Sequence, residues 1–316
     1  MDLEMLQERA RIIRRIRSFF DERNYLELDT PLLSPDLIPE SCLEVFETSR
    51  ILPSGSSSPY WLIPSPEIWM KKIIARHRTN VYQICKCFRN GESTGFLHNP
   101  EFTMLEYYTV NACYTDSLTL TEDLCAFLSF PGFDTRFERM TVAEAFARFA
   151  GFDLFAAAGT EGALETEARR LGLDPPSGGT HELFDLIFIH AVEPRLKQNR
   201  PVALLDYPAF VPSLAKQSKD CKTVERWELY YNGIELANCY SEETDADRVK
   251  EFFRNETVAK EQQALVRHRI DQNYWKLFQG NPPFPPCSGV AMGLDRLIMA
   301  LCNRSSIDSI LPFAMQ

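Results

Sequence analysis

Long apolar stretches are missing from the sequence. None of its 316 residues lie in a run that approaches the roughly 18 apolar residues of a membrane-spanning helix. Residues 1–20 carry charges throughout and lack the apolar stretch and cleavage site of a secretory signal peptide. We therefore expect a cytoplasmic protein.

Paired cysteines are also missing. The chain has nine cysteines, and none of them lie in a CxxC pair. Cys85 and Cys87 form a CxC pair, but no second pair of closely spaced cysteines occurs elsewhere in the chain. An odd and scattered set argues against a disulfide framework and against a structural zinc site. We interpret these cysteines as small apolar side chains buried in a reducing compartment.

There is no excess of positive charge. The formal net charge is −10, and basic residues gather only at 9–17 and at Lys71, Lys72, Arg76 and Arg78. Because proteins that bind nucleic acids usually carry a basic excess or stripe, the overall charge gives no support to a large polyanionic partner. A local basic groove remains open.

Glycine-rich phosphate loops are absent as well. Neither GxGxxG nor GxxxxGK[ST] occurs, and helices do not alternate with parallel strands, which argues against a Rossmann or P-loop nucleotide site.

Apolar periodicity and turn residues predict helices at 3–23, 66 onward, 115–129 and 248–279, and strands at 24–33, 44–48, 60–64, 81–89, 102–110, 202–205, 227–231 and 234–238. This order predicts an α+β fold, an antiparallel sheet flanked by helices. We expect one domain over 1–316 with a small helical insertion at about 140–198.

Residues 88–108 carry the strongest chemical pattern. Arg89 ends a strand, a polar loop with His98 follows, and the next strand presents Phe102 and then Glu106 and Tyr108 on one face. A guanidinium suits a phosphate or carboxylate, a ring can stack on a purine, and a carboxylate with a phenol can bind an amine. Each feature alone is more often an ordinary surface or core residue.

Two later segments add candidates. Glu228 and Glu235 are hard oxygen ligands that suit Mg²⁺ with bound phosphates. In residues 288–297, small residues allow a ligand to approach the backbone, and Arg296 follows them into a helix.

Taken in order, residues 24–33, 88–108 and 289–297 resemble the three motifs of class II aminoacyl-tRNA synthetases. HNPEFTMLE at 98–106 and IELAN at 234–238 look like the lysyl branch. The first motif begins near residue 24, which leaves no room for an anticodon-binding OB-fold of about 100 residues. The chain therefore resembles the elongation factor P–(R)-β-lysine ligases, truncated paralogues of the lysyl synthetases.

The resemblance implies an activity. Such an enzyme uses ATP and Mg²⁺ to form an adenylate of (R)-β-lysine or lysine, and then transfers the amino acid to a lysine ε-amine of elongation factor P. It also implies a homodimer formed through the first motif, with no membrane partner and no tRNA.

The resemblance further implies site roles. Arg89 and Arg296 would stabilise the charge of the reacting phosphates. The residues implied for ATP are Arg89, Asn90, Gly91, Asn99, Phe102, Glu235, Leu236, Gly293 and Arg296, and those for Mg²⁺ are Glu228 and Glu235. The residues implied for the amino acid are Ser65, Pro66, Glu67, Glu106, Tyr108, Asn238, Glu242 and Ala291. Glu67 would bind the α- or β-ammonium, whereas Glu106, Tyr108 and Glu242 would bind the ε-ammonium.

Three positions bear on the alternatives. Ala291 replaces the glycine of lysyl-tRNA synthetases, as in the ligases, whereas Gly91 and Cys239 depart from the family pattern. Two other functions stay open: a lysyl-tRNA synthetase fragment that charges tRNA, and a catalytically inactive, ligand-sensing paralogue. Similarly, His98 could contact an ATP phosphate or accept a proton in the transfer step.

Overall fold

The chain divides into two compact units. In the computed structural model, which describes residues 2–92, 95–131, 133–176, 178–197 and 200–315, unit 1 comprises Met1–Cys113 and Glu242–Gln316, and unit 2 comprises Tyr114–Ser241. Within these described ranges, no helix is long and apolar enough to cross a membrane. A single domain with an insertion at about 140–198 stays a prediction.

The main sheet strands of unit 1 follow the order β1, β5, β6, β11. They span Leu26–Glu27, Val81–Phe88, Glu101–Val110 and Cys287–Gly293. The pairings β5–β6 and β6–β11 are antiparallel, and β1–β5 is parallel. A small second sheet holds β2 (Leu33–Ser34), β4 (Ser57–Leu62) and β3 (Glu47–Ile51). The last two form an antiparallel pair and overlap the strands expected at 44–48 and 60–64.

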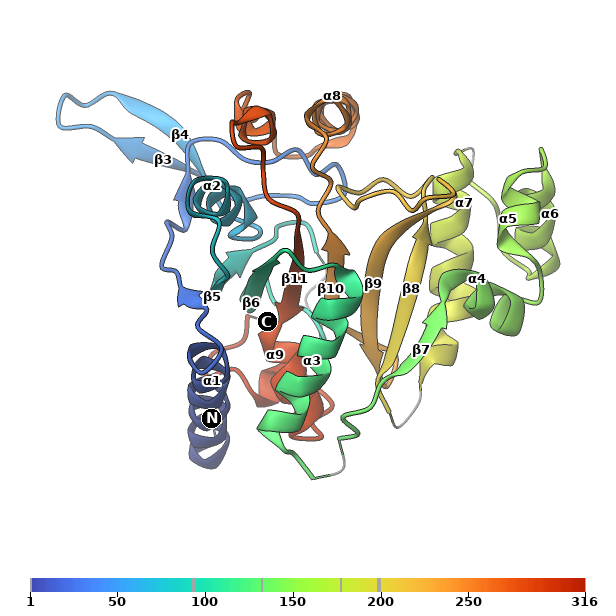
Figure 1. The fold of residues 1–316 in the computed structure, drawn as a ribbon, viewed down its shortest axis with the longest axis horizontal. Coiled ribbons are helices and arrows are strands. Elements are labelled where there is room, and N and C mark those ends of the chain that lie inside the picture. Colours follow the sequence, from blue (N-terminus) through green and yellow to red (C-terminus); the bar gives the residue numbers. More distant parts are fainter. Residues whose placement is uncertain (1, 93–94, 132, 177, 198–199, 316) are drawn as a thin grey trace. The chain divides into compact units, whose positions relative to one another are not determined.

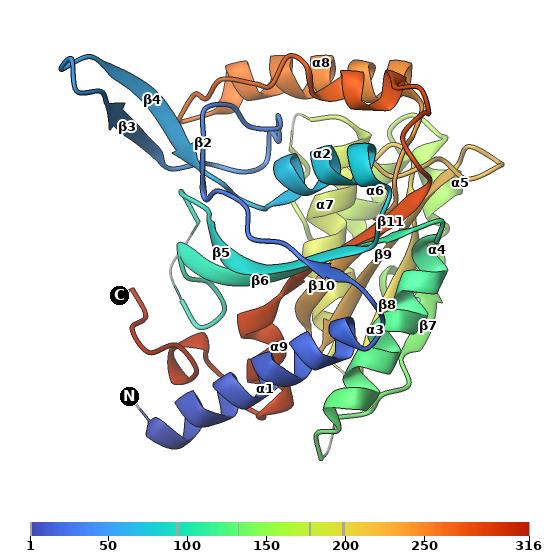
Figure 2. The ribbon, with the colours of Figure 1, turned by 60° about the vertical axis from the view of Figure 1, so that its left-hand side comes forward.

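Helices cover both faces of these strands. The helices of unit 1 are α1 (Leu3–Asp21), α2 (Glu67–His77), α8 (Ala246–Gln263), α9 (Leu294–Leu301), η4 (Tyr274–Gln279) and η5 (Ile307–Ser309). In Figures 1 and 2 the strands lie between α2 and α8 on one side and α1 and α9 on the other. Phe20 of α1 packs its buried ring against Tyr82 and Tyr107, at centroid distances of 4.6 Å and 5.0 Å. The face of the sheet that packs on α1 therefore belongs to the apolar core. The opposite face of the sheet is available for a functional site.

Three predicted elements of unit 1 differ from the structure. The strand expected at 24–33 is reduced to β1 and β2. The helix expected at 248–279 ends at Gln263, because the Glu44 carboxylate accepts hydrogen bonds from the amides of Leu265 and Val266, at 2.9 Å and 3.0 Å. The helix expected from residue 66 onward begins at Glu67, with Pro66 as its N-cap.

Unit 2 has its own sheet strands and helices. Its strands follow the order β10 (Ile234–Ser241), β9 (Thr223–Tyr231), β8 (Val202–Pro208) and β7 (Glu138–Thr141), with β7–β8 parallel. Its helices are α3 (Tyr114–Leu128), α4 (Val142–Ala145), η1 (Phe146–Ala150), α5 (Leu154–Ala158), α6 (Ala163–Arg170), α7 (Thr180–Ile187), η2 (Phe188–Val192) and η3 (Glu193–Leu196). Phe146, Phe184 and Phe188 stack in its core. Residues 175–179, with the sequence Pro-Pro-Ser-Gly-Gly, are a helix-breaking segment within the expected insertion, and Ser177 lies outside the described residues.

Candidate functional site

The strand register of unit 1 brings several predicted residues into one row. Glu106 of β6 lies opposite Gln83 of β5 and Ala291 of β11, and Tyr108 lies opposite Gly289. Because side chains alternate across a strand, Glu106 and Tyr108 point to the same face. That face is opposite the one on which Tyr107 contacts α1, so it is the face next to α2.

An acidic cluster occupies this face. We use this name for Glu67, Glu106, Tyr108, Glu242 and Lys71. The Lys71 ammonium lies 2.6 Å from Glu67 Oε1 and 2.6 Å from Glu242 Oε2, and it is 5.9 Å from the centre of the Tyr108 ring. The Tyr108 hydroxyl donates to Glu106 Oε1 at 2.8 Å. Thus the structure brings together four residues predicted to bind the amino acid, with a lysine between two of the acids.

Burial shapes the electrostatics of the cluster. Lys71 is fully buried, and Glu106 and Glu242 are each 2% exposed. Burial raises the pKa of Glu242 to about 8, and the Glu67 carboxylate raises it too, whereas Lys71 lowers it. Burial, and then Glu67, also raise the pKa of Glu106 well above its ordinary value. Without a further cation, the ionised form of both carboxyls is therefore disfavoured, and Glu242 holds a proton near neutral pH.

Two oxygens of the cluster lack hydrogen bonds. Glu106 Oε2 and Glu242 Oε1 are buried and have no hydrogen-bond partner among the described residues. Gly289 closes the floor: a Cβ there would lie 2.4 Å from Tyr108 Cε1 and 2.9 Å from Glu242 Oε1. Since buried polar atoms almost always have partners, the two oxygens indicate a cationic or donating ligand.

A second group of predicted residues lies at the end of β5. The Arg89 guanidinium is 5.2 Å from the centre of the Phe102 ring. Its Nε is buried with no hydrogen-bond partner within the described ranges, and Nη1 is 3.9 Å from the Glu92 carboxylate. The structure thus brings Arg89 and Phe102 together, with donor capacity left on the guanidinium.

Arg296, near the start of α9, contacts Leu97 and His98 in the segment between β5 and β6. Its Nη2 lies 2.8 Å from His98 Nε2, and its Nε donates to the Leu97 carbonyl at 3.2 Å. Burial, followed by Arg296, lowers the pKa of His98. Because a guanidinium only donates, Nε2 of a neutral His98 accepts this hydrogen bond. His98 therefore orients Arg296, which fits a phosphate contact better than a free base.

Asn90 and Asn99, whose side-chain amides are predicted to bind ATP, make hydrogen bonds within the protein. Asn90 donates from its backbone to the Glu44 carbonyl at 2.9 Å, and its side chain bonds the Val45 carbonyl and the Gly91 amide. Asn99 bonds the Glu101 carbonyl and the Met315 amide. Both side chains shape the loop in this structure, and their contact with ATP stays a prediction.

The two glycines predicted for ATP differ from each other. Gly91 has a φ of +72°, and a Cβ there would lie 3.2 Å from the Glu44 side chain. This crowding and the left-handed backbone explain why the loop has glycine at this position. A Cβ on Gly293 would meet nothing nearer than Arg296 at 3.7 Å, so protein packing does not require that glycine.

The remaining predicted residues belong to unit 2. Glu228 Oε2 accepts hydrogen bonds from Tyr207 at 2.6 Å and Tyr230 at 2.7 Å, and Oε1 accepts one from Arg226 at 2.6 Å. Glu235 acts electrostatically on these same three partners, so the two predicted metal ligands share one neighbourhood. Among the described residues, no group of three or more His, Cys, Asp or Glu could hold a metal.

Two other residues predicted for the ligand also lie in unit 2. Leu236 is buried, and Asn238 has a buried Oδ1 with no hydrogen-bond partner in the described part of the chain. Asn238 lies opposite Glu228 in the β9–β10 pairing. Their contacts with ATP or substrate stay predictions.

Sequence reasoning missed the role of Lys71. From the sequence it is named only as one of several basic residues near Lys72, whereas in the structure it is buried between two carboxylates. One signal was available: Glu67 and Lys71 have the i,i+4 spacing of a helical ion pair.

The prediction that no disulfide forms is confirmed, since all nine cysteines are free. Cys42 and Cys221 are exposed, so the expectation that the cysteines are buried is wrong for these two.

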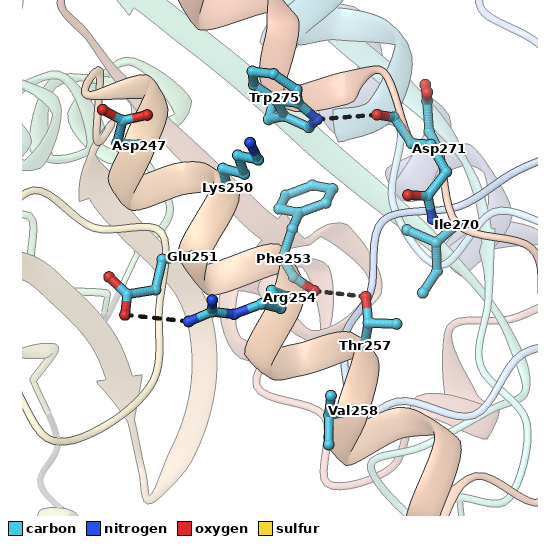
Figure 3. Close-up of a pocket in the computed structure, with 11 residues that line it drawn as sticks. Asp247, Lys250, Glu251, Phe253, Arg254, Thr257, Val258, Ile270, Asp271 and Trp275 are labelled. Carbon is cyan, nitrogen blue, oxygen red and sulfur yellow. Dashed lines mark hydrogen bonds and ion pairs between the residues drawn. The ribbon is translucent and has the colours of Figure 1, made fainter.

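A separate pocket of about 630 Å³ lies along α8 (Figure 3). Phe253, Ile270 and Trp275 line it together with charged residues of both signs. Lys250 lies 4.6 Å from the Trp275 ring, and Arg254 pairs with Glu251 at 3.7 Å. None of the residues predicted for ATP, metal or amino acid lines this pocket.

Comparison with the sequences of known proteins identifies the family of this chain. The family model for class II tRNA synthetases (D, K and N) matches residues 3–316. The elongation factor P–(R)-β-lysine ligase of Avibacterium paragallinarum is 34% identical over 99% of this chain and 96% of its own length. The ligases of Mannheimia succiniciproducens and Histophilus somni (strain 2336) are 34% and 36% identical, over 99% and 98% of this chain and 95% of their own lengths.

Proposed function

Because the chain belongs to the class II aminoacyl-tRNA synthetases and, within them, to the elongation factor P–(R)-β-lysine ligases, we propose that it activates lysine or (R)-β-lysine with ATP and transfers it to elongation factor P. One observation carries the choice of amino acid. The acidic cluster holds two buried carboxylate oxygens that have no hydrogen-bond partner among the described residues. Such oxygens suit the ammonium groups of a diamino acid.

The residues of unit 1 support the first half-reaction. An oxygen of the substrate carboxylate attacks the α-phosphorus of ATP, the bond to the leaving phosphate oxygen breaks, and pyrophosphate departs. Arg89 would hold the substrate carboxylate and the α-phosphate, with Phe102 as a stacking surface for adenine. Arg296, oriented by His98, would contact the γ-phosphate. Catalysis here is positioning and charge stabilisation.

The second half-reaction uses the protein acceptor. A neutral lysine amine of elongation factor P attacks the adenylate carbonyl carbon, an amide bond forms, and AMP leaves with its electron pair. The nitrogen loses a proton in this step, and His98 does not suit its removal because Nε2 already accepts a hydrogen bond from Arg296.

Glu228 and Glu235 are the carboxylates proposed for Mg²⁺. When bound, Mg²⁺ supplies charge neutralisation of the phosphates. Both are oxygen donors, as Mg²⁺ prefers. In this structure Arg226 already neutralises one oxygen of Glu228, and Tyr207 and Tyr230 bond the other. A homodimer, and the exclusion of tRNA as acceptor, are part of the same proposal.

The test is a two-by-two experiment. Purified protein and ATP receive labelled α-lysine or (R)-β-lysine, with either elongation factor P or tRNA as acceptor. We expect label on elongation factor P, more from (R)-β-lysine than from α-lysine, and none on tRNA. Label only on tRNA would replace the proposal with a synthetase activity, and lysine-independent ATP use would refute it.

A further inference from the structure

Lys71 stands out as a buried cation that none of the proposed steps uses. It lies on α2, one turn after Glu67, and its side chain is completely buried. A lysine of this kind is rare unless it is paired, and here it is paired twice, with Glu67 and with Glu242 at 2.6 Å each. The Glu106 and Cys287 side chains also lie within its electrostatic reach.

The way in which Lys71 binds the acids leaves selected oxygens for a ligand. It contacts Glu242 through Oε2, while Glu242 Oε1 lies close to Gly289 and has no hydrogen-bond partner in the described residues. In the same way, Tyr108 bonds Glu106 Oε1, and Glu106 Oε2 has no such partner there. One oxygen of each acid is therefore anchored and the other is left for the ligand.

The charges support the same conclusion. When ionised, Glu67, Glu106 and Glu242 carry three negative charges, and Lys71 neutralises one of them. The remaining two match the two ammonium groups of lysine or β-lysine. Without Lys71, three carboxylates would repel one another in a buried site, and the cluster would take up protons in place of a ligand.

We propose that Lys71 is a positioning residue for amino-acid binding, which holds Glu67 and Glu242 by one oxygen each and leaves the cluster with charge for one diamino acid. This inference rests on the proposed function, because the ligand is the diamino acid of that reaction. Lys71 acts through the two glutamates, as an outer partner orients a metal ligand.

The experiment compares K71M with K72M. Lys72 is the neighbouring lysine, partly exposed and paired with Asp271 at 2.6 Å, so K72M is a matched control. Lysine-dependent pyrophosphate exchange gives separate KM values for lysine and ATP. For K71M we expect the KM for lysine to rise about 10- to 100-fold and the KM for ATP to change less than about twofold. For K72M both should stay within about twofold.

The other outcomes are informative. A KM for lysine that is unchanged or lower in K71M would overturn the inference, since a lower value would mean that Lys71 competes with the substrate. Equal increases in both KM values would mean general damage to the site and would overturn it as well. If K71M does not fold, K71Q, which retains a donor without the charge, is measured by the same criteria. Absence of lysine-dependent exchange in the wild-type protein would instead remove the proposed function itself.

Discussion

Gly289→Ala tests the geometry of the acidic cluster most directly. The new methyl group would lie 2.4 Å from Tyr108 Cε1 and 2.9 Å from Glu242 Oε1, far inside normal contact distances. Tyr108 is 3% exposed and its hydroxyl bonds Glu106, so the ring cannot move without breaking that bond. Overpacking of this kind costs about 1–3 kcal/mol.

Gly293→Ala is the matched control for stability. It lies on the same strand, and its methyl group would be 3.7 Å from the nearest atom, an ordinary contact. Both substitutions reduce the freedom of the unfolded chain by the same amount, so this effect cancels between them. The free energy of unfolding of Gly289→Ala should therefore be about 1–3 kcal/mol lower than that of Gly293→Ala.

Two measurements decide the matter. Denaturant unfolding followed by tryptophan fluorescence gives the stability difference, and calorimetric titration gives the affinity for lysine. Only Gly289→Ala should weaken this affinity, by about tenfold or more, because about 1.4 kcal/mol corresponds to a factor of ten. Equal stabilities together with unchanged lysine affinity would refute the close packing of Tyr108 and Glu242 on Gly289.

Four further predictions concern residues of unit 1. Lysine affinity should rise as the pH increases from 6 to 8 and then level off, because burial raises the pKa of Glu242 to about 8 and cation binding needs its ionised form; titration at several pH values checks this, and a flat profile contradicts it. In the ligand-free protein, where this pKa exceeds the unfolded value, the same carboxyl should lower stability as the pH rises from the ordinary 4.5 toward 8. Arg89→Ala should reduce pyrophosphate exchange by about 10²–10³-fold with an unchanged circular dichroism spectrum, and normal exchange would exclude its proposed role. Ala291→Gly should shift preference toward α-lysine by about 1–3 kcal/mol at most, and an unchanged ratio of kcat/KM values would show that this methyl group does not discriminate.

The central strands could be predicted because their signals are local. Residues 81–88 and 101–110 form the antiparallel pair expected from their sequence, and α1 follows the apolar period that ends with Phe20. A spacing of two along β6 was enough to place Glu106 and Tyr108 on one face. These features depend on neighbours in the sequence, which a single chain reveals.

Other features depend on distant residues and could not be predicted. No glycine or proline interrupts residues 246–279, so local signals favour a helix over the whole range. The helix nevertheless ends at Gln263, and the Glu44 carboxylate, more than 200 residues earlier in the chain, binds the backbone amides of Leu265 and Val266. The burial of Lys71 likewise depends on a distant residue, because one of its two carboxylate partners, Glu242, comes from a segment far along the chain.

The acidic cluster also explains why net charge says little about the ligand. The overall charge of −10 is spread over a solvated surface, where salt screens it within about 10 Å. Glu106 and Glu242 lie instead in a buried site, where a charge interacts far more strongly than it does in water. Their raised pKa values record the energetic cost of leaving these acids without a cation. A diamino acid that supplied two ammonium groups would remove that cost, which is the physical reason why the proposed site would favour such a substrate.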